Sequence, residues 1–262
     1  MATAYERVRI ARGAKRPTGM DYLQNVFHGF FELHGDRRYA DDPAIVGGLA
    51  YLGATPVTVI AIEKGHTAKE RVQRGFGAPQ PEGYRKALRL MRQAEKFHRP
   101  VVCFVDTSGA GCNVGAEERG QGEAIAECLT TMSALQTPVL SILIGEGGSG
   151  GALALAAGDR VWMLENAVYS VISPEGCATI LWKDAAKAEQ AAEELKLTAD
   201  DALALGVVES VIPEAGLGEP EFYAALAQRL MREVDALTEM PIQELLSARY
   251  ARFRRFGGEA QR

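Results

Sequence analysis

Cysteine and histidine, the side chains that most often build metal centres, are scarce in this chain. It has four of each among 262 residues. The cysteines lie at positions 103, 112, 128 and 177 without a CxxC pair, and the histidines lie at positions 28, 34, 66 and 98. This scatter excludes a zinc site and a histidine metal site, makes a poor disulfide framework, and offers no Ser-His-Asp triad. We therefore expect no metal in this chain.

Signals for export, membrane insertion and nucleic-acid binding are also missing. The sequence has no signal-peptide pattern, and no apolar run reaches the roughly 20 residues that cross a bilayer. We therefore expect a cytoplasmic protein in a reducing compartment, with no membrane partner. The net charge of −5 argues against nucleic acid as the main partner. One basic, aromatic run, Arg249–Phe256, is interpreted as a solvated terminal helix.

The apolar residues that are present follow a strand–helix alternation. Hydrophobic residues make up 47% of the chain and charged residues 24%, as in ordinary globular proteins. The runs Val101–Val105 and Val139–Ile144 are dominated by apolar side chains, and each is followed by a glycine-containing loop and a helix. Strands of this kind are covered on both faces, so the sequence predicts an α/β fold.

The other expected elements can be placed along the chain. Two strands at residues 45–52 and 57–62 predict a hairpin, and the polar stretch 64–81 predicts a long loop. Further strands are predicted at residues 161–164, 169–172 and 207–212. Helices are predicted at about residues 18–34, 82–98, 116–135, 150–157, 174–181, 185–195, 199–205 and from about 219 onward.

The strongest local signal for chemistry is the glycine-rich run Gly145–Ala152, where a buried strand gives way to a helix. The first turn of a helix leaves N–H groups unpaired, and glycine lets a ligand approach them closely. Two such donors aimed at one oxygen form an oxyanion hole, worth about 3–4 kcal/mol per donor. A Rossmann loop fits the spacing poorly, and the P-loop ending is missing. Ser149 completes a G-x-S-x-G hydrolase pattern, but no histidine follows it. A glycine-rich turn without function also stays open.

A second glycine-containing loop, Asp106–Gly111, follows the preceding strand. The carboxyl ends of neighbouring strands meet in one crevice, so both loops are expected to face one site. Asp106 could serve in catalysis or cap a turn, and capping alone could explain Glu117, Glu118 and Arg119. The sequence offers no general base with an orienting partner. This inventory favours stabilisation of an enolate or a ureido oxyanion.

Several long motifs resemble the carboxyltransferase α subunit of bacterial-type acetyl-CoA carboxylase. The matching segments are residues 34–48, 81–89, 114–121, 145–154, 169–178 and 180–183, and the similarity runs from about Arg16 to about Pro213. Residues 197–213 also resemble a segment common in the wider crotonase superfamily. The resemblance implies a crotonase-like β-β-α superhelix over residues 36–218, with helical extensions at residues 1–35 and 219–262.

The resemblance also implies chemistry and partners. The activity would be transfer of a carboxyl group from carboxybiotin, presented on a biotin carboxyl carrier protein, to acetyl-CoA, giving malonyl-CoA. A zinc-ribbon carboxyltransferase β subunit would bind the acyl-CoA within an α2β2 heterotetramer. By resemblance, Gly150, Gly151 and Ala152 would donate N–H groups to the ureido oxygen of biotin. The implied substrate contacts are Gly109, Ala110, Gly147, Gly148, Ser149, Ser173, Pro174, Glu175 and Gly176. Lys64 and Arg119 are the implied cofactor contacts.

Two segments depart from the family pattern. Residues 106–113 read Asp-Thr-Ser-Gly-Ala-Gly-Cys-Asn where the family typically has Asp-Thr-Pro-Gly-Ala-Tyr-Pro-Gly. We expect the loss of two prolines and an aromatic to loosen the rim of the site. Residues 63–66 read Glu-Lys-Gly-His where Gln-Lys-Gly-Arg is usual. This change removes a positive charge and adds a negative one, and it is expected to weaken binding of CoA phosphates or carboxybiotin.

Two other functions are compatible with the sequence. A crotonase-fold acyl-CoA hydratase or decarboxylase acting alone would need its own acid or base, for which no residue stands out. A catalytically silent scaffold would assemble with a β-like partner without supporting turnover, although the intact run Gly150–Ala152 argues against it.

Overall fold

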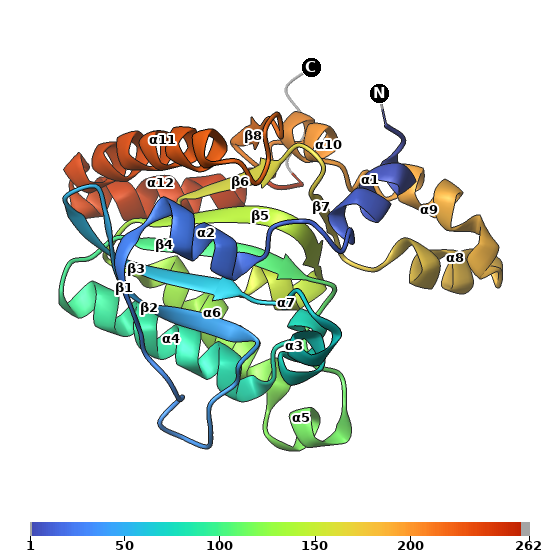
Figure 1. Ribbon diagram of the computed structural model, residues 1–262, viewed down its shortest axis with the longest axis horizontal. Coiled ribbons are helices and arrows are strands. Elements are labelled where there is room, and N and C mark those ends of the chain that lie inside the picture. The colour runs from blue at the N-terminus through green and yellow to red at the C-terminus, as the bar shows by residue number, and fades with distance from the viewer. Residues whose placement is uncertain (1, 258–262) are drawn as a thin grey trace.

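The centre of the fold is one mixed sheet (Figure 1). The computed structural model describes residues 2–257, and within them eight strands run in the order β1-β2-β3-β4-β5-β6-β8, with β7 paired to the end of β5. The strands are His28–Glu32 (β1), Ile45–Leu52 (β2), Thr55–Ile62 (β3), Val101–Thr107 (β4), Val139–Gly148 (β5), Arg160–Leu164 (β6), Val168–Ser170 (β7) and Ser210–Ile212 (β8). The first three strands are antiparallel, and the pairings from β3 onward are parallel. This sheet confirms the predicted α/β class.

Helices cover both faces of the sheet (Figure 1). The α-helices are Ala4–Ala11 (α1), Gly19–Val26 (α2), Ala68–Gln73 (α3), Pro81–Lys96 (α4), Val114–Glu118 (α5), Gln121–Ala134 (α6), Ser149–Leu153 (α7), Pro174–Trp182 (α8), Ala188–Glu194 (α9), Ala199–Ala204 (α10), Pro220–Glu239 (α11) and Ile242–Arg254 (α12). Two short 3-10 helices are Gly75–Gly77 (η1) and Ala185–Lys187 (η2). α4 and α6 pack together on one side of the sheet, and α2 and α11 lie on the other. α1, α8 and α9 extend beyond the sheet at the right of Figure 1.

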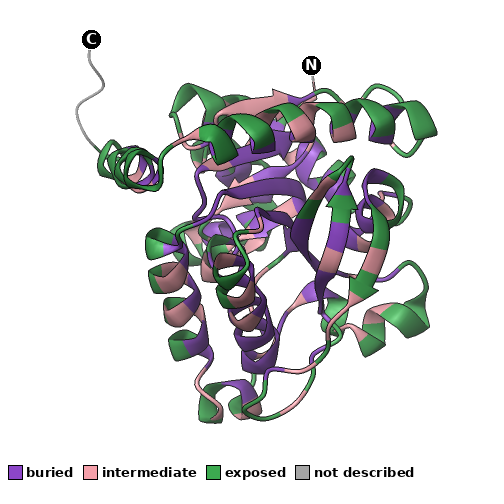
Figure 2. Ribbon diagram, turned by 90° about the vertical axis from the view of Figure 1, so that its left-hand side faces the viewer, coloured by how far each residue is buried: buried purple, intermediate pink, exposed green. Residues whose placement is uncertain are grey.

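The parallel centre of the sheet is buried because its strands are apolar. Every residue of β4 is buried, and Figure 2 shows buried strands beneath helices whose outer faces are exposed. α4 follows the predicted periodicity: its inward face, Tyr84, Ala87, Leu88, Met91 and Ala94, is fully buried. Pro81 occupies the first turn of α4, where a missing N–H costs nothing. The predicted hairpin is confirmed as β2 and β3.

The helix expected over residues 18–34 is wrong in its second half. α2 ends at Val26, and residues 28–32 form β1, which pairs with β2. Gly29 adopts a φ of 65°, which glycine reaches without strain and which breaks the helical path. Phe30 and Phe31 then alternate between the core side and solvent, so these aromatic residues follow the period of a strand instead of a helix.

Four other expected elements differ in detail. The loop over residues 64–81 contains α3 and η1, because Thr67 and Glu70 form a capping box that starts a helical turn. The helix expected at residues 116–135 is broken into α5 and α6 at Gly120, whose φ is 78°. The helix expected at residues 150–157 ends at Leu153. The stretch 185–195 divides into η2 and α9.

Three aspartates fix the long loop between β1 and β2. Asp36 accepts the N–H groups of residues 38, 39 and 40 and pairs with Arg85 at 2.8 Å. Asp41 pairs with the fully buried Lys86 at 2.6 Å. Asp42 is buried and accepts the N–H groups of residues 44 and 80. The loop is therefore held by charges and backbone donors in place of apolar packing.

The C-terminal helix is fastened by a buried guanidinium. Arg249 on α12 is 1% exposed in its side chain and pairs with Asp159 at 2.8 Å. It also donates to the carbonyls of Met132, Leu135 and Thr137. The terminal run is helical as predicted, but its interpretation as solvated is wrong for Arg249 and Arg252, which are both buried.

Replacement of Arg249 by methionine should lower the free energy of unfolding by about 3–5 kcal/mol, because it leaves Asp159 buried without its cation. Urea denaturation followed by circular dichroism measures the change. Arg254, exposed on the same helix, provides the control: Arg254→Met should change stability by less than about 0.5 kcal/mol. Equal effects of the two substitutions would contradict the importance of the buried pair.

Asp41 should give stability an acid dependence. Burial alone would raise its pKa, but hydrogen bonds from Lys86 and the Gly35 N–H outweigh it and lower the pKa from 3.8 to about 2. The ionised form therefore stabilises the fold above about pH 4, and this contribution is lost as the pH falls toward 2. Because Asp41 is partly exposed, we expect about 1 kcal/mol. Unfolding measured from pH 5 to pH 2 should show a shallower loss for Asp41→Asn than for the unaltered chain; parallel curves would refute the assignment.

Candidate functional site

β5 ends in a glycine-rich segment that leads directly into α7, and we name residues 147–151 the glycine turn. Gly148 caps α7, and Ser149 begins it with a φ of 50°. The N–H groups of Gly150 and Gly151 fall in the first helical turn, and residues 2–257 provide no acceptor for them. Ala152 is the first position whose N–H can bond the N-cap carbonyl. The two glycines therefore present free donors, as an oxyanion hole requires.

The loop after β4 lies directly against this turn. A Cβ placed on Gly148 would lie 2.2 Å from the carbonyl oxygen of Ser108. A Cβ on Gly151 would lie 2.5 Å from the Ala110 nitrogen and 2.8 Å from the Tyr84 hydroxyl oxygen. Side chains cannot fit at such distances. The expected convergence of the two loops is therefore confirmed, and glycine is required where they touch.

Asp106 ties the two strand ends together. Its carboxylate accepts the Glu146 N–H at 2.8 Å and pairs with Lys64 Nζ at 2.6 Å. The β4–β5 register shifts at this point, between Val105 and Thr107. Burial would lower the pKa of Lys64, but Asp106 and Glu146 raise it, so Lys64 stays charged. Asp106 thus joins β4, β5 and the segment after β3.

A polar groove opens beside these residues. Its volume is about 310 Å³, and its lining includes Arg12, Lys64, Asp106, Ser108 and Glu146. Arg12, Ser108 and Glu146 also line a smaller adjoining depression, together with Gly147, Gly148, Ser173 and Pro174. The structure therefore brings five of the predicted site residues, Lys64, Gly147, Gly148, Ser173 and Pro174, to one continuous region.

Arg12, which caps the C-terminal end of α1, is a residue of this region that the sequence reasoning missed. It pairs with Glu146 and with Glu175, each at 2.8 Å. Burial would raise the pKa of Glu175, but the hydrogen bond from Arg12 lowers it. Ser173 caps α8 by accepting the Gly176 N–H at 3.1 Å. No local motif marks Arg12, because its partners lie more than a hundred residues away in the sequence.

Ser149 and Gly150 face a different depression, also of about 310 Å³. It is mostly apolar, with Leu153, Tyr169, Ser170, Val171 and Val207 completing its lining. The strained turn at Ser149 does resemble a nucleophile elbow. Among the described residues, however, this lining contains no histidine, lysine or carboxylate to activate the hydroxyl. The structure gives a hydrolase function no support.

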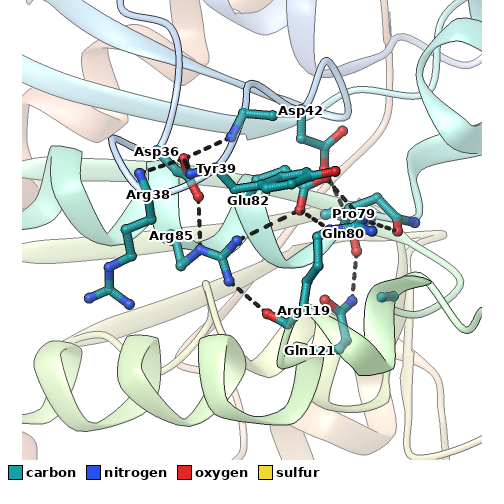
Figure 3. A network of polar contacts seen from close by, with 12 residues as sticks. Asp36, Arg38, Tyr39, Asp42, Pro79, Gln80, Glu82, Arg85, Arg119 and Gln121 are labelled. Carbon is teal, nitrogen blue, oxygen red and sulfur yellow. Dashed lines mark hydrogen bonds and ion pairs between the residues drawn. The ribbon is translucent and has the colours of Figure 1, made fainter. Parts of the chain in front are cut away.

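The structure places the two predicted cofactor contacts, Lys64 and Arg119, in different regions. Lys64 lies in the polar groove, whereas Arg119 lies in a separate polar network (Figure 3). Arg119 pairs with Glu82 at 3.1 Å and lies over the Tyr39 ring at 4.9 Å from its centroid. It does not line the depressions beside the glycine turn. The position of Arg119 in the sequence does not indicate that its side chain lies away from these depressions.

Glu63 does not add the surface charge that the sequence suggested. Its side chain is buried and accepts the N–H groups of Met20 and Gly65, each at 2.6 Å. It therefore fixes the start of α2 against the end of β3. His66, the other departure in this segment, pairs with Asp21 at 2.9 Å. Glu63 therefore has a structural role, and its effect on anion binding stays a prediction.

Comparison with known proteins gives concordant results. Residues 1–257 match the family model described as acetyl co-enzyme A carboxylase carboxyltransferase-like. The acetyl-coenzyme A carboxylase carboxyl transferase subunit alpha of Ruminiclostridium cellulolyticum is 58% identical over 97% of this chain and 98% of its own. A protein of Natranaerobius thermophilus named for subunits beta/alpha is 53% identical over 97% of this chain and 43% of its own. A Pseudomonas malonate decarboxylase hetero-tetramer in complex with coenzyme A contains a chain with a TM-score of 0.73 at 17% identity, covering 91% of this chain and 98% of that one.

The structural likeness and the sheet together define a crotonase-like fold, as the sequence predicted. Within that class, the chain belongs to the acetyl-CoA carboxylase carboxyltransferase family, and its sequence relatives are of the α type. Among residues 2–257, no group of three or more histidine, cysteine or acidic side chains is arranged to hold a metal ion. No helix in the same range is long and apolar enough to span a bilayer.

Gly150 and Gly151 should respond differently to alanine. A Cβ on Gly151 meets backbone at 2.5 Å, whereas one on Gly150 meets only Ile125, at 3.7 Å. Gly151→Ala should therefore lower the free energy of unfolding by about 1–3 kcal/mol. Gly150→Ala should leave stability unchanged or raise it by up to about 1 kcal/mol, because alanine favours the helix. Thermal and urea unfolding of both variants test this; similar losses in both would contradict the proposed close contact.

Proposed function

We propose that the chain acts as the carboxybiotin-binding half of a carboxyltransferase that makes malonyl-CoA from acetyl-CoA. The observation that carries the proposal is the pair of free N–H donors at Gly150 and Gly151. Gly150 lines the apolar depression, and the preceding Gly147 and Gly148 line the depression that adjoins the polar groove. Family membership over residues 1–257 supplies the reaction class, and the site supports the role within it.

The residues present fit an N-carboxylated ureido group. Carboxybiotin supplies the carboxyl group and, once that group has left, a ureido nitrogen that can accept a methyl proton of acetyl-CoA. Gly150 and Gly151 would stabilise negative charge on the ureido oxygen as the N–C bond breaks; removal of one such donor typically costs about 10²–10³ in kcat. Ala152 is the third donor that the sequence predicts. Because its N–H is placed to bond the N-cap carbonyl, we assign it to the support of the turn. Gly109 and Ala110 would hold the donors in place by backbone contact.

The polar groove would receive the substrate's charged end. Lys64 lies there with Arg12 and Arg71. Two carboxylates, Asp106 and Glu146, also line the groove and pair with Lys64. Arg71 lines the groove without a carboxylate partner in the described residues. The groove can therefore hold an anion while the two carboxylates keep Lys64 oriented. Arg12, through its pair with Glu175, would hold the residues that form the far wall of the groove: Ser173, Pro174, Glu175 and Gly176.

A β-type partner would complete the site from the other side of α7. The depression beside Ser149 is apolar and open, and its Val171 is 73% exposed. Exposed apolar side chains of this kind often mark protein interfaces. The relative named for subunits beta/alpha carries both parts in one chain. We propose a zinc-ribbon β subunit in an α2β2 assembly, a biotin carboxyl carrier protein as donor, and a cytoplasmic location.

The experiment is the reverse reaction, malonyl-CoA-dependent carboxylation of biocytin, with this chain alone and with a co-expressed β subunit. Turnover is expected only in the mixture. Gly151→Ala should lower kcat by about 10²-fold or more, because it displaces the donors. Gly122→Ala is the matched control, since a Cβ there meets nothing within 4 Å.

Turnover by the chain alone would contradict a divided site and favour a stand-alone acyl-CoA enzyme. A stable complex with the β subunit but without turnover would favour the scaffold function. Equal activity of Gly151→Ala and Gly122→Ala would show that the glycine turn does not contribute to the reaction.

A further inference from the structure

The segment that departs most from the family pattern is well tied in this structure. We name residues 107–113 the rim loop. Within it, Thr107 Oγ1 accepts the Gly109 N–H at 3.0 Å and donates to the Gly109 carbonyl at 2.7 Å. The Gly111 N–H donates to the carbonyl of Pro79 at 2.8 Å. The rim loop therefore depends on the segment that precedes α4.

Gln80 fills the space beside the rim loop. A Cβ on Gly111 would lie 2.1 Å from Gln80 Nε2, so no side chain fits there while Gln80 keeps its position. Gln80 Oε1 accepts from Asn113 Nδ2 and from Arg119 Nη2, each at 3.3 Å. One amide side chain thus contacts the middle and the end of the rim loop. Gln80 therefore occupies the space beside Gly111, the position at which the family pattern has a tyrosine.

Buried groups hold Gln80 and Pro79 in turn (Figure 3). Asp42 is 5% exposed, and its Oδ2 accepts the Gln80 N–H at 2.7 Å. A Cβ on Gly83 would lie 2.4 Å from that same oxygen, so the carboxylate is packed against the first turn of α4. Gln121 Nε2 donates to the Pro79 carbonyl at 2.8 Å. The support is therefore continuous from the core to the rim loop.

We propose that Gln80, anchored by Asp42, is a positioning residue for the carboxyl transfer. It acts through Gly111 on the rim loop, whose residues 108–110 pack on Gly148 and Gly151, and so sets the direction of the N–H donors. The role rests on the proposed function, because it concerns the same donors. The side chain of Gln80 does not line the polar groove, and it acts on the substrate only through the loop.

A double-mutant cycle tests the proposal in the complex with the β subunit. Gly111→Ala introduces the clash, Gln80→Ala opens the space, and the double variant carries both. Gly111→Ala should lower kcat/KM for biocytin by about tenfold or more, since small displacements of catalytic groups have large effects. Gln80→Ala should lower kcat/KM as well, because it removes the support of the rim loop, and the double variant should lose clearly less than the product of the two single losses, as coupled neighbours do. The KM for malonyl-CoA and the thermal midpoint should stay near those of Gly122→Ala.

A conservative variant keeps the test decisive if Gly111→Ala does not assemble. Asn113→Asp preserves the helix cap, in which Asn113 Oδ1 accepts the Ala116 N–H, but removes the donor to Gln80. It should lower kcat/KM for biocytin several-fold, by about the two- to tenfold range of one lost hydrogen bond, without changing the thermal midpoint.

Three results would overturn the proposal. Unchanged kinetics in Gly111→Ala and Asn113→Asp would show that the contacts between Gln80 and the rim loop do not affect the reaction. Losses that simply multiply in the double variant, with a normal thermal midpoint, would show that Gln80 is not the coupled partner. Equal losses for biocytin and malonyl-CoA would indicate general weakening of the fold. If the unaltered complex itself has no turnover, the proposed function fails, and the positioning role fails with it.

Discussion

The site depends on one close approach between two backbone segments, the loop after β4 and the turn after β5. Asp106 makes this approach possible, because it neutralises Lys64 and accepts the Glu146 N–H where the strand register shifts. Both strands are buried and rigid, so the donors of α7 are directed by the sheet. The glycines at 145, 148 and 151 serve this contact, since a Cβ at each would meet atoms within 2.5 Å.

Much of this arrangement could be predicted because its signals are local. Apolar runs identify β4 and β5, and an apolar face with a period of 3.6 residues identifies α4. The rule that parallel strand ends converge then brings residues 106–111 and 145–152 together without any long-range information. Phe30 and Phe31 show the limit of local signals: aromatic residues suit helix and strand alike, and pairing with β2 decides between them.

The remaining features could not be predicted because they depend on distances between remote segments. Arg12 reaches Glu146, and Arg249 reaches Asp159, across 134 and 90 positions of the sequence. Lys64 and Arg119 look equivalent as cations, yet only Lys64 reaches the groove. Glu63 looked like an added surface charge, whereas its carboxylate satisfies buried N–H groups. In each case the type of side chain indicated what chemistry it could perform, but the sequence did not indicate where in the fold it lies.

The glycine turn separates two surroundings of opposite character. On one side the polar groove holds paired charges, and on the other an apolar depression is lined, among the described residues, by no acidic side chain, histidine, lysine or arginine. The carboxylates of the polar groove, Asp106 and Glu146, are already engaged by Lys64 and Arg12. Neither is free to abstract a proton without breaking an ion pair that fixes the site. In the proposed function the proton acceptor must therefore arrive with the substrate, and the chain contributes position and electrostatic stabilisation.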